Sequence, residues 1–208
     1  MALNSRLHFG WPVAWLAVMA LLASCATAPR PPDTVLDVAA QREFIASLDS
    51  YRFEGRVAVA AGSEGFNASL DWTQAGSGST VRLASPLGAG SLRLRFGDDQ
   101  LRVESSRGQV LEGTEAQGVL REQLGFTPPL DDLRYWLLGR PAPGGEALEE
   151  RDSGGQLLTL TQHGWRIEYQ EYQPQHATLG VVSLPTRLRA TREDLRLRVV
   201  IDRWRLDH

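Results

Sequence analysis

The stretches "RFEGRVAV" (residues 52–59) and "FNASLDWT" (residues 66–73) decide the fold class, because apolar and polar side chains alternate in both of them. A period of two is typical of a β-strand that buries one face and exposes the other to water. The intervening "AGSEG" (residues 61–65) contains two glycines and has the length of a hairpin turn. The two stretches therefore predict an antiparallel β-hairpin.

The same alternation recurs on both sides of the middle of the chain. Each recurrence predicts a short strand with one apolar and one wet face. The apolar positions that mark these strands are Val81 and Leu83; Leu92, Leu94 and Phe96; Leu101 and Val103; Val110 and Leu111; Leu158 and Leu160; Trp165, Ile167 and Tyr169; Leu184 to Ala190; and Leu195, Leu197, Val199 and Ile201. In the last strand the phase changes at Val199–Val200, which predicts a β-bulge there.

Three other segments have the spacing of helices. Residues 36–48 place apolar side chains on one helical face, and Asp33 and Thr34 in front of them are suitable N-cap residues. Thr114–Gln117 has the pattern of a capping box, which predicts a helix that ends near Leu124.

A third helix is predicted to begin at Pro128–Asp132 and to end at Gly139. About ten to eleven strands and three helices fit one α+β domain. We expect an open, strongly curved antiparallel β-sheet, an incomplete barrel, with the helices on its concave side. Such an interior is either filled by side chains or encloses an apolar cavity, and the alternation alone does not distinguish the two.

Residues 1–24 have the features of an export signal. An apolar segment over residues 13–23 follows Arg6, and it is shorter than the roughly 20 residues that a membrane-spanning helix needs. The segment ends in "LASC" (residues 22–25), which resembles the lipobox of bacterial lipoproteins. We therefore predict that the chain is cut before Cys25 and that Cys25 is acylated. The alternative is an ordinary signal peptide with a cysteine near its end.

The residues around Cys25 also predict where the protein is anchored. Cys25 is the only cysteine, so it has no partner for an internal disulfide. Ala26 follows it in place of the aspartate that marks inner-membrane lipoproteins, which favours the outer membrane. Residues 25–34 form the acylated cysteine and a proline-rich tether. Residues 35–208 form a single domain that we expect to face the periplasm.

The sequence contains few motifs that indicate catalysis or cofactor binding. A net charge of −3 argues against a nucleic-acid partner. His163, His176 and His208 have no neighbours at metal-ligand spacing, and neither a nucleophile motif nor a dinucleotide fingerprint occurs. We therefore expect no enzyme activity, no metal and no cofactor.

Several motifs together resemble the LolB family, the outer-membrane receptors that complete lipoprotein sorting in Gram-negative bacteria. They are the lipobox, "GRVAV" (55–59), "PLG" (86–88), "LRYWLLGRP" (133–141) and "GWRIEYQ" (164–170). The resemblance covers nearly the whole mature chain and implies an open barrel lidded by helices with an apolar cavity inside. It further implies a monomer that accepts triacylated lipoproteins from the periplasmic carrier LolA and inserts them into the outer-membrane lipid, without nucleotide hydrolysis.

The resemblance also assigns candidate site residues. Pro86, Leu87 and Gly88 match a protruding loop of the family, whose leucine dips into the bilayer surface. Strand parity and the resemblance together give the acyl-cavity candidates, although a register error of one residue inverts the faces of a strand. These candidates are Val57, Val59, Phe66, Leu70, Trp72, Leu83, Leu94, Trp136 and Trp165.

Three alternatives stay open at this point. The candidates for the cavity are also good residues for an ordinary core. The anchor and tether suit an outer-membrane scaffold or assembly factor for envelope machinery equally well. They also suit a hydrolase acting on lipid or cell wall, which would need a nucleophile and a base in one cleft.

Overall fold

The computed structural model describes residues 34–86, 90–98 and 100–206. The chain divides into two compact units, residues 1–30 and residues 31–208, and the second contains all the described residues. The expected signal peptide, the acylated Cys25 and most of the tether lie outside the described residues and stay predictions. The same holds for Leu87 and Gly88 of the expected membrane loop.

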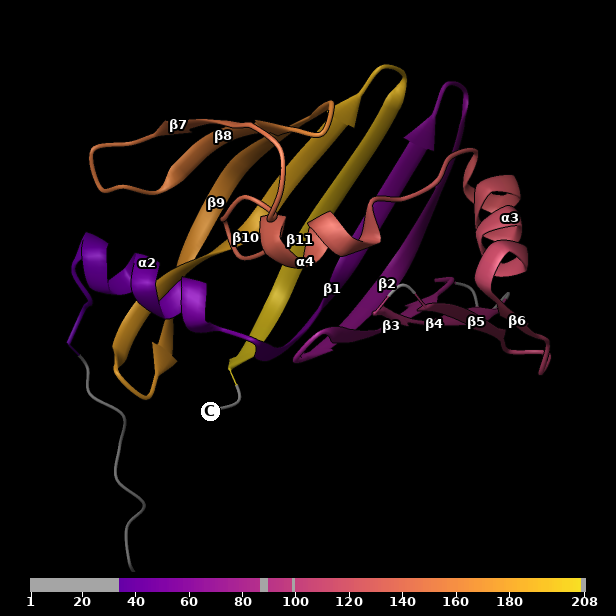
Figure 1. Cartoon of the computed structure of the whole chain (residues 1–208), viewed down its shortest axis with the longest axis horizontal. Helices are drawn as coiled ribbons and strands as arrows, with labels where there is room; N and C mark the ends of the chain where they lie inside the picture. The colour runs from indigo at the N-terminus through magenta and orange to yellow at the C-terminus, as the bar shows by residue number, and fades with distance from the viewer. Residues whose placement is uncertain (1–33, 87–89, 99, 207–208) are drawn as a thin grey trace, which may run out of the picture. The chain divides into compact units, whose positions relative to one another are not determined.

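The described residues form one eleven-stranded antiparallel sheet with the order β6-β5-β4-β3-β2-β1-β11-β10-β9-β8-β7 (Figure 1). Its edge strands, β6 and β7, pair only with β5 and β8 and not with each other, so the sheet stays open. The predicted fold class is thereby confirmed. The strands are β1 (Ser50–Ala61), β2 (Glu64–Ala75), β3 (Gly78–Ala84), β4 (Ser91–Gly97), β5 (Gln100–Ser105), β6 (Val110–Glu112), β7 (Ala147–Arg151), β8 (Leu157–Gln162), β9 (Trp165–Ala177), β10 (Gly180–Arg192) and β11 (Leu195–Leu206).

The first and last strands pair in the middle of the sheet. Val57 of β1 lies opposite Val199 of β11, and the register shifts between Glu54 and Gly55. The shift leaves Asp202 of β11 without a counterpart, so the bulge predicted at Val199–Val200 was placed wrongly. The apolar Val200 suggested the earlier position, but its half-buried side chain belongs to the outer face of the sheet, away from the core.

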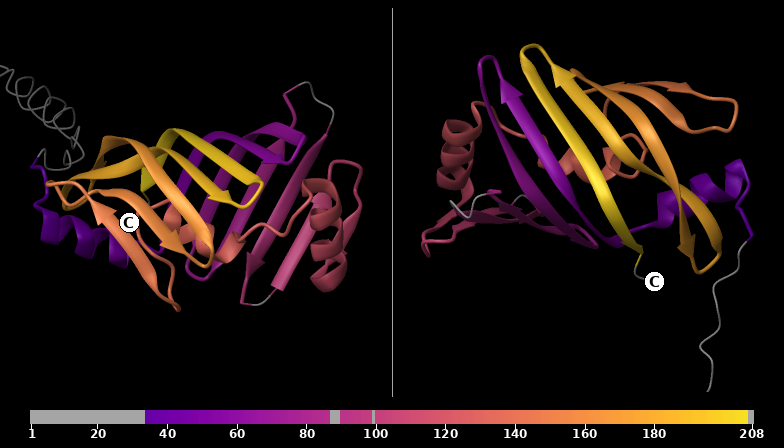
Figure 2. Two further views of the ribbon diagram at one scale, coloured as in Figure 1. Left: turned by 90° about the horizontal axis from the view of Figure 1, so that it is seen from above. Right: turned by 180° about the vertical axis from the view of Figure 1, so that it is seen from behind.

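Three helices accompany the sheet in the described residues: α2 (Val38–Ser47), α3 (Gly113–Leu124) and α4 (Leu130–Trp136). The two views of Figure 2 place α4 against one face of the sheet, which we call the inner face. The N-cap of α2 is Asp37, whose side chain accepts a hydrogen bond from the backbone N–H of Ala40 at 2.8 Å. Thr34 lies three residues before this N-cap, and its carbonyl accepts a bond from the N–H of Val181 in β10 at 2.8 Å. The other predicted N-cap residue, Asp33, lies outside the described residues.

The ends of α3 and α4 also differ from the predictions. Helix α3 begins at Gly113 after Glu112, which makes no side-chain cap, so the predicted capping box does not form. Its C-cap is Gly125 with φ 77°, a left-handed conformation that glycine adopts without strain. Helix α4 ends at Trp136, and the turn that follows includes Gly139 with φ 74°. No helix among the described residues is long and apolar enough to cross a membrane.

Strand β7 was missed among the strands read from the sequence. Its residues "ALEER" are half-buried only at the two ends and exposed between them. The strand lies at the sheet edge and pairs with β8 alone. An edge strand of this kind has no continuous buried face, so no apolar period of two marks it.

Candidate functional site

One half of the inner face is filled by α4 and the turn after it. Trp136 is fully buried, and its indole N–H donates to Oε1 of Gln162 in β8 at 3.0 Å. The same Oε1 accepts from the backbone N–H of Ala142 at 2.8 Å, and Nε2 of Gln162 donates to the Ala142 carbonyl at 2.8 Å. One buried side chain thus holds both the helix end and the connection to β7.

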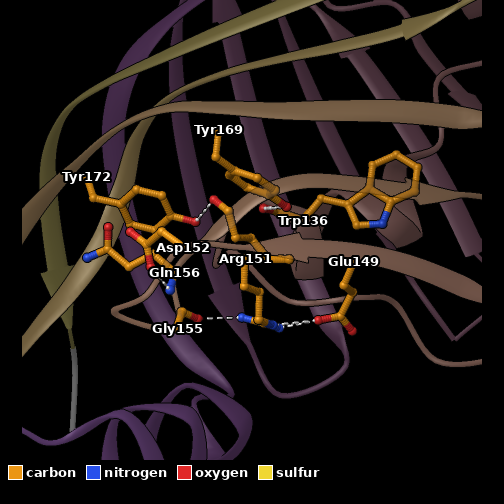
Figure 3. A network of polar contacts seen from close by, with 9 residues as sticks. Trp136, Glu149, Arg151, Asp152, Gly155, Gln156, Tyr169 and Tyr172 are labelled. Carbon is orange, nitrogen blue, oxygen red and sulfur yellow. Dashed lines mark hydrogen bonds and ion pairs between the residues drawn. The ribbon is translucent and has the colours of Figure 1, made fainter.

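Two tyrosines of the sheet bind the backbone of α4. The hydroxyl of Tyr51 donates to the carbonyl of Arg134 at 2.7 Å. The hydroxyl of Tyr169 donates to the carbonyl of Trp136 at 2.9 Å (Figure 3). Burial raises the pKa of both phenols above the ordinary value. Both therefore stay protonated and act as donors throughout the physiological range, which fixes α4 against the inner face.

The same network continues toward the edge of the sheet. The hydroxyl of Tyr172 donates to the carbonyl of Leu157 at 2.9 Å, and Arg151 bonds Glu149 and the carbonyl of Gly155 (Figure 3). These contacts close the β7–β8 hairpin beside the filled half. The C-terminal end of α4 and the turn after it are therefore packed against side chains, with Trp136, Leu137 and Leu138 all buried.

The other half of the inner face is hollow. A cavity of about 480 Å³ lies between strands β1 to β5, helix α3 and the segment from α3 to α4, and its lining is mainly aliphatic. Pockets of roughly 300–1,000 Å³ with apolar walls are typical of sites for small organic ligands. The apolar side chains that line it are Val57, Val59, Phe66, Ala68, Leu70, Val81, Leu83, Leu92, Leu94, Leu120, Leu124, Phe126, Pro128, Leu130, Leu133 and Leu197.

Polar residues gather at one end of this cavity. Asn67 comes from β2, and the others come from the β3–β4 region and the β5–β6 hairpin. A bond from the N–H of Ser106 to the carbonyl of Ser91 at 2.9 Å joins these two regions. The base of the β3–β4 connection is closed by a bond from the N–H of Ser85 to the carbonyl of Gly90 at 3.1 Å. The polar end therefore adjoins the loop that carries Pro86, which is exposed. The polar lining residues are Asn67, Ser85, Ser91, Ser105, Ser106, Arg107 and Gln109.

Six of the nine cavity candidates line this cavity: Val57, Val59, Phe66, Leu70, Leu83 and Leu94. Their contact with acyl chains stays a prediction. The other three face inward too, but they are packed elsewhere. Trp72 contacts Phe53 and Phe96 with ring centroids 5.9 and 5.5 Å apart, and Trp136 lies in the filled half. Trp165 packs against a lining residue, Phe126, with ring centroids 6.1 Å apart.

The sequence analysis missed the wall that the helices provide. Leu120 and Leu124 come from α3, Phe126 from the connection, and Leu130 and Leu133 from α4. A signal for part of this wall was present, because Leu120 and Leu124 are four residues apart and share one helical face. The family resemblance implied helices over a cavity, but the spacing alone does not show whether this face covers a space or packs on the sheet.

The cavity has little capacity for acid–base chemistry. Arg107, at the polar end, is the one ionisable side chain among the lining residues that the structure describes. His163 lies outside the cavity on the surface, where Nδ1 contacts Asp132 at 2.9 Å and Nε2 contacts the carbonyl of Gly144 at 3.0 Å. No cluster of three His, Cys, Asp or Glu residues suited to a metal occurs in the described part of the chain. The arrangement favours binding of an apolar group by burial.

Solved structures resemble this fold at low sequence identity. A LolA-superfamily protein from Nitrosomonas europaea matches with a TM-score of 0.50 and 12% identity over 83% of this chain and 94% of its own. A DUF1329 family protein from Desulfovibrio piger matches with a TM-score of 0.53 and 9% identity over 82% of this chain and 90% of its own. At these identities the likeness concerns the fold alone.

Sequence comparison is more specific. The outer-membrane lipoprotein LolB of Nitrosococcus oceani is 34% identical over 195 residues, which cover 92% of this chain and 95% of the relative. LolB of an Azoarcus species is 31% identical over 90% of this chain and 91% of the relative. Residues 49–204 also match the family model described as outer membrane lipoprotein LolB. The matched segment runs from the start of β1 to near the end of β11. The chain belongs to the LolB family of outer-membrane lipoproteins.

Proposed function

We propose that this protein is the outer-membrane receptor that accepts acylated lipoproteins from the periplasmic carrier LolA and releases them into the outer membrane. Its cargo is a triacylated lipoprotein, whose acyl chains enter the cavity of about 480 Å³. The observation that carries the proposal is this apolar cavity, whose polar end lies beside the Pro86 loop. The protein acts as a monomer anchored through Cys25.

The energetics of transfer support a cavity of this kind. Each methylene exposed to water costs roughly 0.8 kcal/mol, so one long acyl chain in water costs on the order of 10 kcal/mol. The chain must therefore pass from one apolar cavity to the next without an aqueous interval. A transfer that runs down a gradient of affinity needs neither nucleotide hydrolysis nor a catalytic residue, which fits a lining with a single ionisable side chain.

Release involves the loop that contains Pro86, Leu87 and Gly88. Pro86 is exposed next to the polar end of the cavity, and Leu87 and Gly88 follow it outside the described residues. A leucine that enters the bilayer surface would bring the polar end of the cavity to the lipid. In this proposal Leu87 serves release into the membrane more than acceptance from the carrier.

A transfer assay tests acceptance directly. Residues 26–208 are mixed with the carrier of the same organism loaded with a triacylated lipoprotein, and co-purification shows which protein holds the cargo. Leu83→Asp places a carboxylate in the cavity lining. The matched control is Leu148→Asp on β7, where the side chain is 71% exposed and far from the lining residues.

The wild type and Leu148→Asp are expected to take the cargo. Leu83→Asp is expected to hold roughly 100-fold less, because a bound acyl chain would strip water from the carboxylate at a cost of at least about 3 kcal/mol. Normal transfer to a folded Leu83→Asp variant would show that the acyl chains bind elsewhere. If nothing moves to the wild type from an active carrier, the receptor proposal is wrong and a scaffold role becomes the better explanation.

A further inference from the structure

A second hollow lies on the outer face of the sheet, behind the cavity. Val57 points into the cavity, and its neighbours Arg56 and Ala58 point to the opposite side, as successive strand residues do. The hollow has a volume of about 790 Å³. We call it the arginine groove, and its defining residues are Arg56, Ala58, Ser69, Pro86, Arg187 and Arg198. The right view of Figure 2 looks onto the strands that form it.

Strand register concentrates arginines around Arg198 of β11. Its direct neighbours are Ala58 in β1 and Arg189 in β10, so two guanidinium groups stand opposite each other across a strand pair. Arg56 in β1 and Arg187 in β10 lie diagonally across from Arg198, because both are opposite Val200. Like charges in directly opposed positions destabilise a sheet, so the pair Arg189–Arg198 carries an electrostatic cost.

Carboxylates offset only part of this charge. Arg56 pairs with Asp202 at 2.7 Å, and Arg187 pairs with Glu171 at 3.5 Å. For Arg189, Arg198 and Arg196, the last being two residues before Arg198 in β11, no ion pair is found within the part of the chain that the structure describes. Glu168 lies directly opposite Arg189, but it also pairs with Arg166 at 3.5 Å. With that pair included, six arginines and three carboxylates leave a local charge of +3, whereas the chain as a whole carries −3.

Other arginines of the outer face differ in this respect. Arg82 in β3 lies directly opposite Asp71 in β2. Arg93 and Arg95 in β4 both approach Glu104, at 3.8 and 3.9 Å. Arg82 also lies opposite Arg93, and Arg93 and Arg95 share the one carboxylate. Three arginines and two carboxylates leave an excess of +1 here, which is smaller than the excess around the groove.

The floor and position of the groove indicate its ligand. Ala58 and Ser69 are small, so they leave room between the guanidinium groups for a compact anion. Arginine matches phosphate oxygens with two parallel N–H donors. The register that pairs Ser69 with Ala84 continues to place Pro86 beside Asn67, so the groove ends where the β3–β4 loop begins.

We propose that the arginine groove binds the phosphate groups of anionic lipid headgroups and so holds the outer face of the sheet against the membrane. Members of this family are outer-membrane lipoproteins, and a bilayer leaflet supplies such phosphates at high local concentration. The inference rests on the proposed function, because a receptor that releases acyl chains into a bilayer must keep its loop at the lipid surface. The groove adds an electrostatic contact beside that loop.

Vesicle flotation of residues 26–208 tests the groove without the acyl anchor. The vesicles consist of phosphatidylcholine with or without phosphatidylglycerol, at low and high ionic strength. The groove variant combines Arg56→Gln, Arg187→Gln and Arg198→Gln. The control variant, Arg82→Gln with Arg93→Gln and Arg95→Gln, removes the same charge from the same face outside the groove. Circular dichroism and urea unfolding establish that both variants are folded.

The wild type is expected to bind phosphatidylglycerol vesicles and to lose binding at high salt, because exposed charges are screened. Each arginine near an anionic surface raises the membrane partition coefficient roughly fivefold. The groove variant lacks three arginines, so its partition coefficient should be about 100-fold lower. The control variant should bind markedly better than the groove variant. Equal losses in the two folded variants would overturn the inference, because net charge alone would then account for binding.

The carrier assay distinguishes this inference from the proposed function. The groove variant is expected to accept cargo in solution as the wild type does, since none of its three replaced arginines lines the cavity. If the groove variant binds vesicles normally but no longer accepts cargo, the groove is a docking face for an acidic protein and the inference is wrong. A wild type that binds vesicles but never accepts cargo would overturn the proposed function and leave the groove in place.

Discussion

Replacing Gln162 by leucine is expected to destabilise the protein severely, although leucine is apolar and similar in size. The change removes the partners of three buried groups: the indole N–H of Trp136 and the N–H and carbonyl of Ala142, all bonded at 2.8–3.0 Å. Each orphaned buried group costs about 1–3 kcal/mol, and the apolar gain from leucine offsets a small part. We expect a loss of about 3–5 kcal/mol from a total stability that is typically about 5–15 kcal/mol.

Urea unfolding followed by tryptophan fluorescence measures this loss, with the slope of the transition checked for constancy. The matched control is Gln156→Leu, which removes a single bond from Nε2 to the hydroxyl of Ser183 at 2.8 Å and should cost about 1 kcal/mol. Because α4 also supplies Leu130 and Leu133 to the cavity wall, the Gln162 variant should bind cargo more weakly as well. A loss no greater than that of the control would refute the view that Gln162 holds α4 in place.

Two further predictions concern stability. Gly55→Ala should lower the free energy of unfolding in urea by roughly 3 kcal/mol, because a Cβ there would meet the backbone carbonyl of Val200. Gly118→Ala, in open space on α3, should raise it by up to about 1 kcal/mol. A Gly55→Ala variant that is more stable than Gly118→Ala would contradict the packing at the bulge. The hydrogen bond that His163 donates to Asp132 raises the pKa of His163, so the stability that this pair provides is complete below the ordinary pKa of 6.5 and is lost as pH rises through the raised value. The difference in unfolding free energy between the wild type and Asp132→Asn should therefore shrink from about pH 5 to about pH 9, and a constant difference would exclude this linkage.

The inward and outward faces of the long strands could be predicted from the sequence. In β1 and β2 one face is buried and the other is wet, and this asymmetry leaves a period of two in the residues themselves. Strand β7 and the bulge at Asp202 could not be found in that way. The first has no continuous buried face, and the second depends on the partner strand 146 residues away, as the pair Arg56–Asp202 illustrates.

The site was less predictable than the fold. Alternation places Leu70 and Trp72 on the same face, but only the first lines the cavity, because Phe53 and Phe96 enclose the second. Whether an inward side chain contacts another side chain or an empty space depends on where α3 and α4 lie. Helix position is a tertiary property, which the local pattern of one strand does not contain.

The pairing of the first strand with the last strand also constrains how the chain folds. Strand β1 is among the earliest segments to leave the export machinery. One of its two neighbours in the sheet, β11, is the last strand to do so. Until β11 arrives, one edge of β1 carries unpaired backbone groups next to an apolar face, which is a hazard for association with other chains. Contacts this distant in sequence also slow folding, because loop closure precedes any gain from pairing. Loss of β11 would not trim the sheet at its edge; it would divide the sheet into two.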